Sequence, residues 1–289
     1  KDGRVYVNGS YDPILYCLSA DLSQIIWQFD ARNYGSSGEY DWEESSPVIG
    51  CDGTIFMFGG YAFDFCRLFA VNPDGSLKWV SDMPGYGYYV TPVIVNGVVY
   101  AGTDAGRISG FDAKTGQKVF SMFFIGVDFG YYYSLSGDDA SNMLYIGGYD
   151  NVTENDYVLY GINLTNKSFW TLVSPYSSTF TIPVVSGDYI YTTSSGYVLR
   201  INRFTGATGN SGDTSIDYGG FYDNKGVIVK DGFVYCPSNS NGLIKLNKND
   251  LTGEIWRFND GNYISNPTMD GNGNIYFVDE DTSTTYCID

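Results

Sequence analysis

The side chains best suited to chemistry are four carboxylates that lie close together in one segment of the chain, Glu39, Asp41, Glu43 and Glu44. A pair of carboxylates can act as acid and base on a glycosidic bond, so this segment is a candidate site for a carbohydrate-active enzyme. The same composition is typical of a solvated acidic loop, which is the interpretation that we favour. Histidine is absent from the 289 residues, which excludes His-containing triads, His bases and His metal ligands.

A second candidate for chemistry is the segment Asp270-Gly-Asn-Gly-Asn274, which begins like a calcium-binding loop of the EF-hand type. The position that such a loop gives to glycine holds Ile275, and its twelfth position holds Asp281 instead of glutamate. The segment also falls where the other repeats of this chain have their first hairpin turn. We therefore interpret it as a turn and expect no metal site there.

The five cysteines do not predict disulfides. Cys17 and Cys287 occupy the same position of a predicted strand, where other repeats have alanine or glycine, so we expect both to be small buried side chains. Cys51 and Cys66 lie at opposite ends of a predicted strand, about 17–20 Å apart, which is too far for a disulfide. No two cysteines are adjacent in the sequence.

The elements that position these residues are clearest in residues 91–120. This segment predicts one four-stranded antiparallel unit, with strands over residues 92–95, 98–102, 107–111 and 117–120. Asn96-Gly97 is a pair that favours the positive φ angles of a two-residue hairpin turn. Gly116 can supply the positive φ of the second hairpin.

Weaker copies of this unit recur along the whole chain, and repeats of this length bury their faces by stacking on one another. We predict an all-β β-propeller of four-stranded blades, with seven blade positions of which the first and last are incomplete. The outer strands close with aromatic residues, which we expect to be buried between blades: Trp27, Trp79, Phe120, Trp170 and Trp256. We expect one domain over residues 1–289, cut within a blade at both ends from a longer protein in which eight blades are an alternative.

Three motifs carry a resemblance to a known family: Asn72-Pro-Asp-Gly-Ser-Leu-Lys-Trp79, Asp112-Ala-Lys-Thr-Gly-Gln-Lys-Val-Phe120 and Leu251-Thr-Gly-Glu-Ile-Trp256. They resemble the pattern Asp-x-x-Thr-Gly-x-x-x-Trp of the quinoprotein-alcohol-dehydrogenase-like propellers, also called PQQ-like repeats. The resemblance covers essentially the whole chain and implies that each Trp docks between adjacent blades. It does not imply one function, because the family contains dehydrogenases that use PQQ and calcium beside non-catalytic scaffolds such as the outer-membrane assembly lipoprotein.

The resemblance favours the scaffold members. The enzymes of the family hold PQQ under a ring formed by two adjacent cysteines, together with calcium and a catalytic Asp, and this sequence has no such cysteine pair. We therefore expect no bound PQQ, no haem and no catalytic metal. A quinoprotein dehydrogenase and a carboxylate-based carbohydrate-active enzyme remain the alternatives.

Charge and composition restrict the partners. A net charge of −17 disfavours nucleic acid and anionic membrane surfaces. The sequence has no run of 18 apolar residues that would predict membrane insertion. Four Asn-x-Ser/Thr sequons support an extracellular or cell-surface setting, at Asn8, Asn151, Asn163 and Asn166.

The candidate binding residues lie in the segments that connect one predicted blade to the next. In a propeller these segments emerge on one face, and here each of the six carries aromatic residues. Aromatic rings beside carboxylates suit a glycan or a protein partner, whereas rings that pack beneath their own segments would be structural. We predict a ligand-binding face formed by Trp42, Tyr88, Tyr132, Tyr222, Tyr263, Glu39, Asp41 and Glu43. The prediction is a non-catalytic binding or assembly module, outside the cytoplasm and part of a larger chain or assembly.

Overall fold

A computed structural model describes most of the chain and divides it into two compact units. The described residues are 3–9, 13–35, 46–62, 65–85, 91–129, 135–154, 156–208, 226–238, 242–251, 254–258, 264–279 and 281–289. The first unit comprises residues 1–155 and 163–167, and the second comprises residues 156–162 and 168–289. Each unit is described by itself below, and the single domain expected from the sequence stays a prediction.

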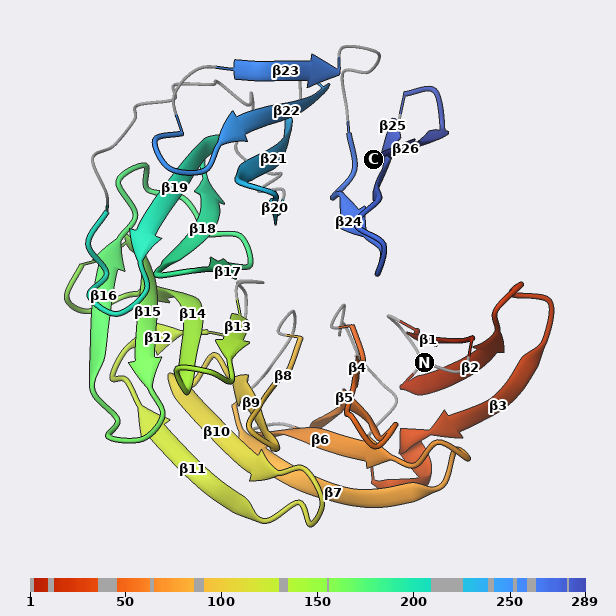
Figure 1. The fold of residues 1–289 in the computed structure, drawn as a ribbon. Coiled ribbons are helices and arrows are strands. Elements are labelled where there is room, and N and C mark those ends of the chain that lie inside the picture. Colours follow the sequence, from red (N-terminus) through yellow and green to blue (C-terminus); the bar gives the residue numbers. More distant parts are fainter. Residues whose placement is uncertain are drawn as a thin grey trace. The chain divides into compact units, whose positions relative to one another are not determined.

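The first unit contains three complete sheets and part of a fourth (Figure 1). The first sheet has the order β1 (Arg4–Asn8), β2 (Ile14–Ser19), β3 (Ile25–Asp30), and the short 3₁₀ helix η1 (Ala31–Tyr34) follows it. The second has the order β4 (Val48–Ile49), β5 (Ile55–Ala62), β6 (Phe65–Val71), β7 (Leu77–Pro84). The third has the order β8 (Val93–Val95), β9 (Val98–Gly102), β10 (Arg107–Asp112), β11 (Lys118–Phe123). Both β12 (Val127–Asp128) and β13 (Leu135–Asp138) pair with β14 (Met143–Asp150).

The second unit continues the same pattern. It begins with the pair β15 (Asp156–Asn163) and β16 (Phe169–Val173). The next sheet has the order β17 (Val184–Ser186), β18 (Tyr189–Ser194), β19 (Tyr197–Asn202). It is followed by β20 (Ile228–Lys230), β21 (Phe233–Ser238), β22 (Gly242–Asn247), β23 (Glu254–Phe258). The last sheet has the order β24 (Thr268–Met269), β25 (Ile275–Asp279), β26 (Thr284–Ile288).

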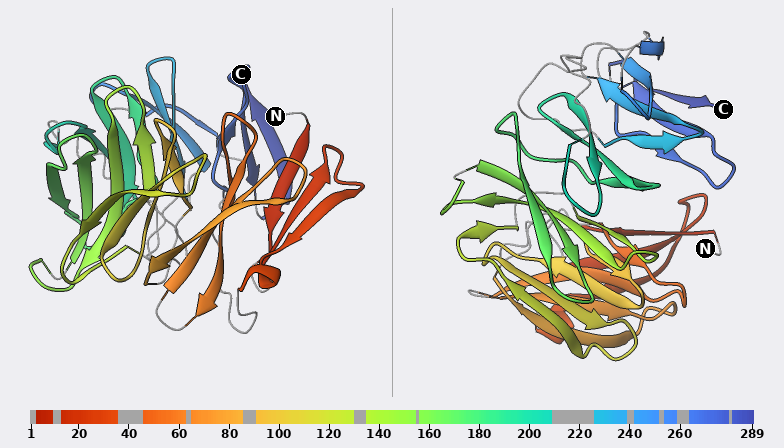
Figure 2. Two further views of the ribbon diagram at one scale, coloured as in Figure 1. Left: turned by 90° about the horizontal axis from the view of Figure 1, so that it is seen from below. Right: turned by 60° about the vertical axis from the view of Figure 1, so that its left-hand side comes forward.

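These seven small antiparallel sheets confirm the predicted all-β propeller fold. Figure 2 shows their hairpins from two further directions. In the third sheet, β8 to β10 match the predicted strands to within one residue at each end, and β11 extends three residues beyond the predicted end of the outer strand. Asn96 and Gly97 have φ angles of 48° and 76°, as the predicted turn requires. The first and last sheets have three strands each, as expected.

The sheets share a repeated register that explains how each one packs. The third strand carries one residue that lies directly opposite the closing aromatic of the fourth strand: Cys17 faces Trp27, Ala70 faces Trp79, Gly110 faces Phe120 and Gly161 faces Trp170. We call this third-strand position the slot. A small slot residue leaves room for the aromatic ring. At Gly161, for example, a Cβ atom would lie 2.1 Å from Cε2 of Trp170.

Two sheets break this pattern, and the sequence analysis did not detect it. Lys245 fills the slot opposite Trp256, and Arg200 stands at the corresponding position of β19, two residues before the turn. Each cation lies over an aromatic ring of the neighbouring strand, 4.0 Å from the Phe233 ring centroid for Lys245 and 3.5 Å from the Tyr189 centroid for Arg200. Large slot residues are therefore accommodated by cation–π contacts instead of close packing.

The cysteines agree with the predictions in part. None of the five forms a disulfide, and Cys17 is buried as expected. Cys287 is exposed, so the prediction of a buried side chain was wrong at this position. Both faces of the last strand β26 carry largely exposed residues, which explains the difference. None of the helices among the described residues has the length and apolarity of a membrane span.

Candidate binding surface and the junctions that position it

All of the predicted site residues lie outside the described part of the chain. They are Trp42, Tyr88, Tyr132, Tyr222, Tyr263, Glu39, Asp41 and Glu43, and the neighbouring Glu44 lies outside it as well. The binding face that they define stays a prediction. The described residues show how the segments around them are anchored.

The connecting segment between β16 and β17 is described over its full length, and its aromatic rings pack on the protein. Tyr176 stacks on Tyr197 with ring centroids 3.8 Å apart and an interplanar angle of 8°. Phe180 is buried, with 2% of its surface exposed. The Ser174 and Ser194 hydroxyl groups lie 2.9 Å apart, and Ser194 also donates to the carbonyl of Ser178. In this segment the structural interpretation of the aromatic residues is correct.

Two further aromatic residues of the connecting segments pack in the first unit. Tyr34 stacks on Phe29 at 5.2 Å, and its carbonyl accepts a hydrogen bond from Nη1 of Arg67 at 2.8 Å. Phe129 is buried against Phe124, with ring centroids 5.5 Å apart and nearly perpendicular. These contacts anchor the beginning of each of the two segments, as a loop-borne binding surface requires.

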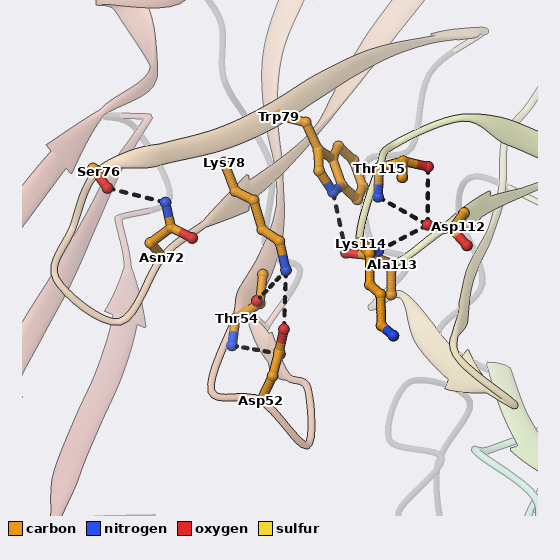
Figure 3. Close-up of polar contacts among 10 residues, drawn as sticks. All are labelled: Asp52, Thr54, Asn72, Ser76, Lys78, Trp79, Asp112, Ala113, Lys114 and Thr115. Atoms are coloured by element: carbon orange, nitrogen blue, oxygen red, sulfur yellow. Dashed lines mark hydrogen bonds and ion pairs between the residues drawn. The ribbon is translucent and has the colours of Figure 1, made fainter.

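The sheets themselves are joined by docked tryptophans. Trp79 on β7 donates from Nε1 to the carbonyl of Ala113, in the turn that precedes β11, at 3.1 Å (Figure 3). Its ring covers Gly116, which has a φ of 72°, and a Cβ there would lie 2.7 Å from Cδ2 of Trp79. Only 8% of Trp79 is exposed. We call such a contact between an outer-strand residue and the next sheet's turn a junction.

Two more junctions have the same construction. Trp27 donates to the carbonyl of Pro73 at 3.0 Å, and Trp170 donates to that of Arg203 at 3.0 Å. The rings cover Gly75 and Gly206 respectively, where a Cβ would lie 2.9 Å and 2.6 Å from the ring. The predicted docking role is therefore confirmed for three tryptophans, although Trp27 and Trp170 are half-buried instead of fully buried.

Other junctions work without tryptophan. Phe120 meets a turn in which Lys167 takes the glycine position at a φ of 61°, and the Lys167 ammonium lies 5.1 Å from the Phe120 ring centroid. The sheet of β17 to β19 meets the turn before β23. There the hydroxyl of Tyr191, on β18, donates to the carbonyl of Lys248 at 3.0 Å.

Two further residues complete the junction between Tyr191 and the turn before β23. Arg200 donates from Nη1 to the carbonyl of Asn249, and Leu251 takes the glycine position at a φ of 56°. Sequence comparison of the repeats missed Tyr191, because it lies on the second strand of its sheet instead of the fourth.

Trp256 departs from the prediction of burial. It is 37% exposed, and its described ring contact is with Phe258 at 6.2 Å. Lys245 lies opposite Trp256, where Ala70 lies opposite Trp79. The described residues of the next sheet end with its third strand, β26, so they include no turn like those that receive Trp27, Trp79 and Trp170.

Comparison with known proteins identifies the family. Residues 1–210 match the model of a PQQ-like repeat family described as "Outer membrane protein assembly factor BamB". The chain belongs to this family. No curated protein sequence matches it.

Solved structures show the same fold at low sequence identity. BamB from Moraxella catarrhalis is 18% identical with a TM-score of 0.67, and the match covers 99% of this chain and 78% of that one. A europium-containing methanol dehydrogenase is 12% identical with a TM-score of 0.63, covering 99% and 76%. The computationally designed Ika8 protein is also 12% identical with a TM-score of 0.63, covering 100% and 84%.

In this BamB-family chain, two of the described carboxylates, Asp112 and Asp52, accept hydrogen bonds within turns. Asp112 accepts hydrogen bonds from the backbone N–H groups of Lys114 and Thr115 and from the Thr115 hydroxyl, which hold its pKa below the usual value. The ammonium of Lys78 lowers the pKa of Asp52 to about 2 (Figure 3). A general acid needs the opposite shift. Neither carboxylate is therefore suited to act as a general acid, and both stabilise their turns.

The remaining candidate for a cation is likewise a turn. Asp270 accepts hydrogen bonds from the side chain and backbone of Asn274, from the backbone of Asn272 and from the Tyr276 hydroxyl. Its oxygens therefore close the hairpin between β24 and β25, which confirms the interpretation as a turn. Within the described ranges, no three His, Cys, Asp or Glu side chains gather as metal ligands would.

Proposed function

We propose that this chain is a non-catalytic binding or assembly propeller that holds a protein partner outside the cytoplasm. The observation that carries the proposal is the family match over residues 1–210. The description of that family names an outer membrane protein assembly factor. A location outside the cytoplasm also agrees with the four sequons and the acidic composition. The turn-bound state of Asp52, Asp112 and Asp270 supports a structural use of carboxylates in this chain.

The proposed contact surface is the face that carries the connecting segments. Its anchors are Trp42, Tyr88, Tyr132, Tyr222 and Tyr263, with acceptors from Glu39, Asp41 and Glu43. Buried Trp and Tyr side chains contribute much of the energy at protein interfaces. Because the chain has a net charge of −17, complementary charge favours a basic partner. A glycan is the alternative ligand, since sugar rings also stack on aromatic side chains.

The test compares two variants of the purified protein. In the loop variant, Trp42→Ala, Tyr88→Ala and Tyr222→Ala remove three proposed anchors. In the matched control, Phe169→Ala and Phe204→Ala remove exposed rings outside the connecting segments. Envelope proteins retained by the wild type are identified by mass spectrometry, and a glycan array is probed in parallel.

We expect the loop variant to lose a specific envelope protein that the wild type and the control retain, with far-UV circular dichroism unchanged. If the loop variant loses a glycan signal instead, the ligand of this surface is a glycan and not a protein. Identical profiles for all three proteins would refute the proposed surface.

The quinoprotein alternative is favoured by one observation, the fold shared with a methanol dehydrogenase. It is tested by adding PQQ with calcium or a lanthanide and measuring dye-linked oxidation of methanol. We expect neither a quinone absorbance on the protein nor turnover, and either signal would replace the scaffold proposal.

A further inference from the structure

The first unit exposes three large apolar side chains, one at the end of β11 and two on neighbouring turns. Phe123, Ile125 and Val152 are 54%, 74% and 63% exposed, and we call them the rim patch. The turns touch at Gly126, where a Cβ would lie 2.1 Å from Cγ2 of Val152. The backbone N–H of Asn151 donates to the carbonyl of Gly126 at 2.9 Å. The patch adjoins the connecting segment that runs from β11 towards β13.

The protein holds these side chains outward. Phe124 is buried against Phe129, and its N–H donates to the carbonyl of Gly106 at 2.8 Å. Phe129 donates to the carbonyl of Thr103 at 3.2 Å, and Val127 pairs with β14. Since Phe124 points inward from an anchored backbone, its neighbour Ile125 cannot turn in to be covered. An apolar surface that is fixed in this way is pre-organised for binding.

The surroundings of the rim patch are acidic. Glu154 lies on the turn of Val152, Asp128 lies on β12 close after Ile125, and Asp104 lies in the turn between β9 and β10. One cation accompanies these carboxylates, because the guanidinium of Arg107 lies over the Phe123 ring, 4.8 Å from its centroid. The whole chain carries a net charge of −17. This charge disfavours a second copy of the chain and an anionic membrane as occupants. Two of the three side chains are aliphatic and offer no ring for a sugar to stack on.

The adjoining strand favours an extended occupant. β11 is the edge strand of its sheet, so one side of its backbone faces away from the ladder, although the carbonyl of Ser121 accepts a hydrogen bond from Nζ of Lys167 at 3.3 Å. Val119 on the same strand is 54% exposed. A segment that lies along β11 would cover Val119 and end on Ile125 and Val152, in the manner of an added strand.

We propose that the rim patch docks an extended segment of a partner protein, with apolar residues alternating with Lys or Arg. The proposal rests on the proposed binding function and adds the chemistry of the partner and a contact that the aromatic residues of the sequence do not reveal. The apolar residues meet Phe123, Ile125 and Val152, and the basic residues meet the surrounding carboxylates.

The probe is a fluorescent peptide of about ten residues with alternating Val and Lys, measured by anisotropy. Two peptides serve as controls, one with Glu in place of Lys and one with Ser in place of Val. The patch variant is Ile125→Ser with Val152→Ser, and Ile125→Ser alone is the milder form. The matched protein control is Ile25→Ser with Ile26→Ser, which removes exposed aliphatic residues from β3. Urea midpoints establish that the variants are folded.

We expect the wild type and the β3 control to bind the Val/Lys peptide, and the patch variant to bind it roughly tenfold more weakly. Binding should fall with salt and be weaker for both control peptides. Three results would overturn the proposal: no binding by the wild type, equal binding by the patch variant, or equal binding of the Ser/Lys peptide. Sedimentation of a dimer that the patch variant abolishes would overturn it in favour of a second copy.

The loop variant of the preceding section separates the two proposals. If it retains the Val/Lys peptide while the patch variant loses it, the rim patch is a binding site whatever the outcome for the aromatic face. If the loop variant loses its envelope partner and the patch variant retains both partner and peptide, the rim-patch proposal fails while the proposed function stands.

Discussion

Two kinds of junction hold neighbouring sheets of this chain together, and their difference shows what the repeated motif is for. Trp79 places its ring on Gly116 and its indole N–H on the carbonyl of Ala113. Tyr191 reaches the equivalent carbonyl, that of Lys248, from a different strand, and the glycine position there is Leu251. The hydrogen bond to the turn carbonyl is the same, but the Tyr191 junction has neither an indole ring nor a glycine beneath it.

The glycine therefore serves the tryptophan as much as it serves the turn. Lys167 and Leu251 adopt a positive φ at the same place without being glycine, so the backbone alone does not demand it. What the glycine provides is the absence of a Cβ beneath an indole ring. The Thr-Gly and Trp elements of the repeat are two halves of one contact that spans successive sheets.

The largest expected effect is the removal of a buried indole. Trp79→Ala should lower the free energy of unfolding by about 3–5 kcal/mol, as for other buried aromatic residues. Trp256→Ala should cost about 1–2 kcal/mol, because its exposed ring loses less buried area. Urea unfolding followed by far-UV circular dichroism would measure both losses. Equal losses would mean that exposure of the ring does not measure its contribution to a junction.

Sequence reasoning recovered the fold because the turns are local. Asn96-Gly97 sets a hairpin by itself, and the short apolar runs on both sides of it define β8 and β9. Sequence reasoning failed where the burial of a residue depends on its partners in the fold. Trp256 was expected to be buried because it occupies the motif position, although Lys245 lies opposite it and the described residues include no turn after β26 to receive it.

The same limit applies to the contacts between sheets and to the site. Tyr191 is one of many tyrosines in the sequence, and only the folded structure places its hydroxyl on the turn of the next sheet. Ile125 and Val152 are ordinary aliphatic residues whose exposure depends on how Phe124 is anchored. The predicted aromatic face rests on position in the repeat alone, and it stays a prediction.

An intermediate effect is expected where a methyl group is added beneath an indole. Gly116→Ala should cost about 2–4 kcal/mol, since it adds both a positive φ for an L-residue and a clash with Trp79. Lys167→Ala is the control at the equivalent turn position. It should cost less than about 1 kcal/mol, because a Cβ is already present there and only the exposed contacts of the ammonium with the Phe120 ring and the Ser121 carbonyl are lost. If the two substitutions cost the same in urea unfolding, the pairing of glycine with tryptophan would be coincidental.

The smallest expected effect concerns the junction that lacks tryptophan. Burial raises the pKa of Tyr191, so its hydroxyl stays protonated and can donate to the carbonyl of Lys248. Tyr191→Phe removes that hydrogen bond together with the interaction of the hydroxyl with Arg200, and should cost about 0.5–1.5 kcal/mol. Tyr189→Phe keeps the ring beneath Arg200 and should be nearly neutral. Amide hydrogen exchange would locate the loss, with faster exchange expected at Leu251, whose N–H closes the same turn onto Asn247. Unchanged stability and exchange in Tyr191→Phe would mean that Arg200 alone secures this junction, and that the tyrosine hydroxyl does not replace the indole N–H.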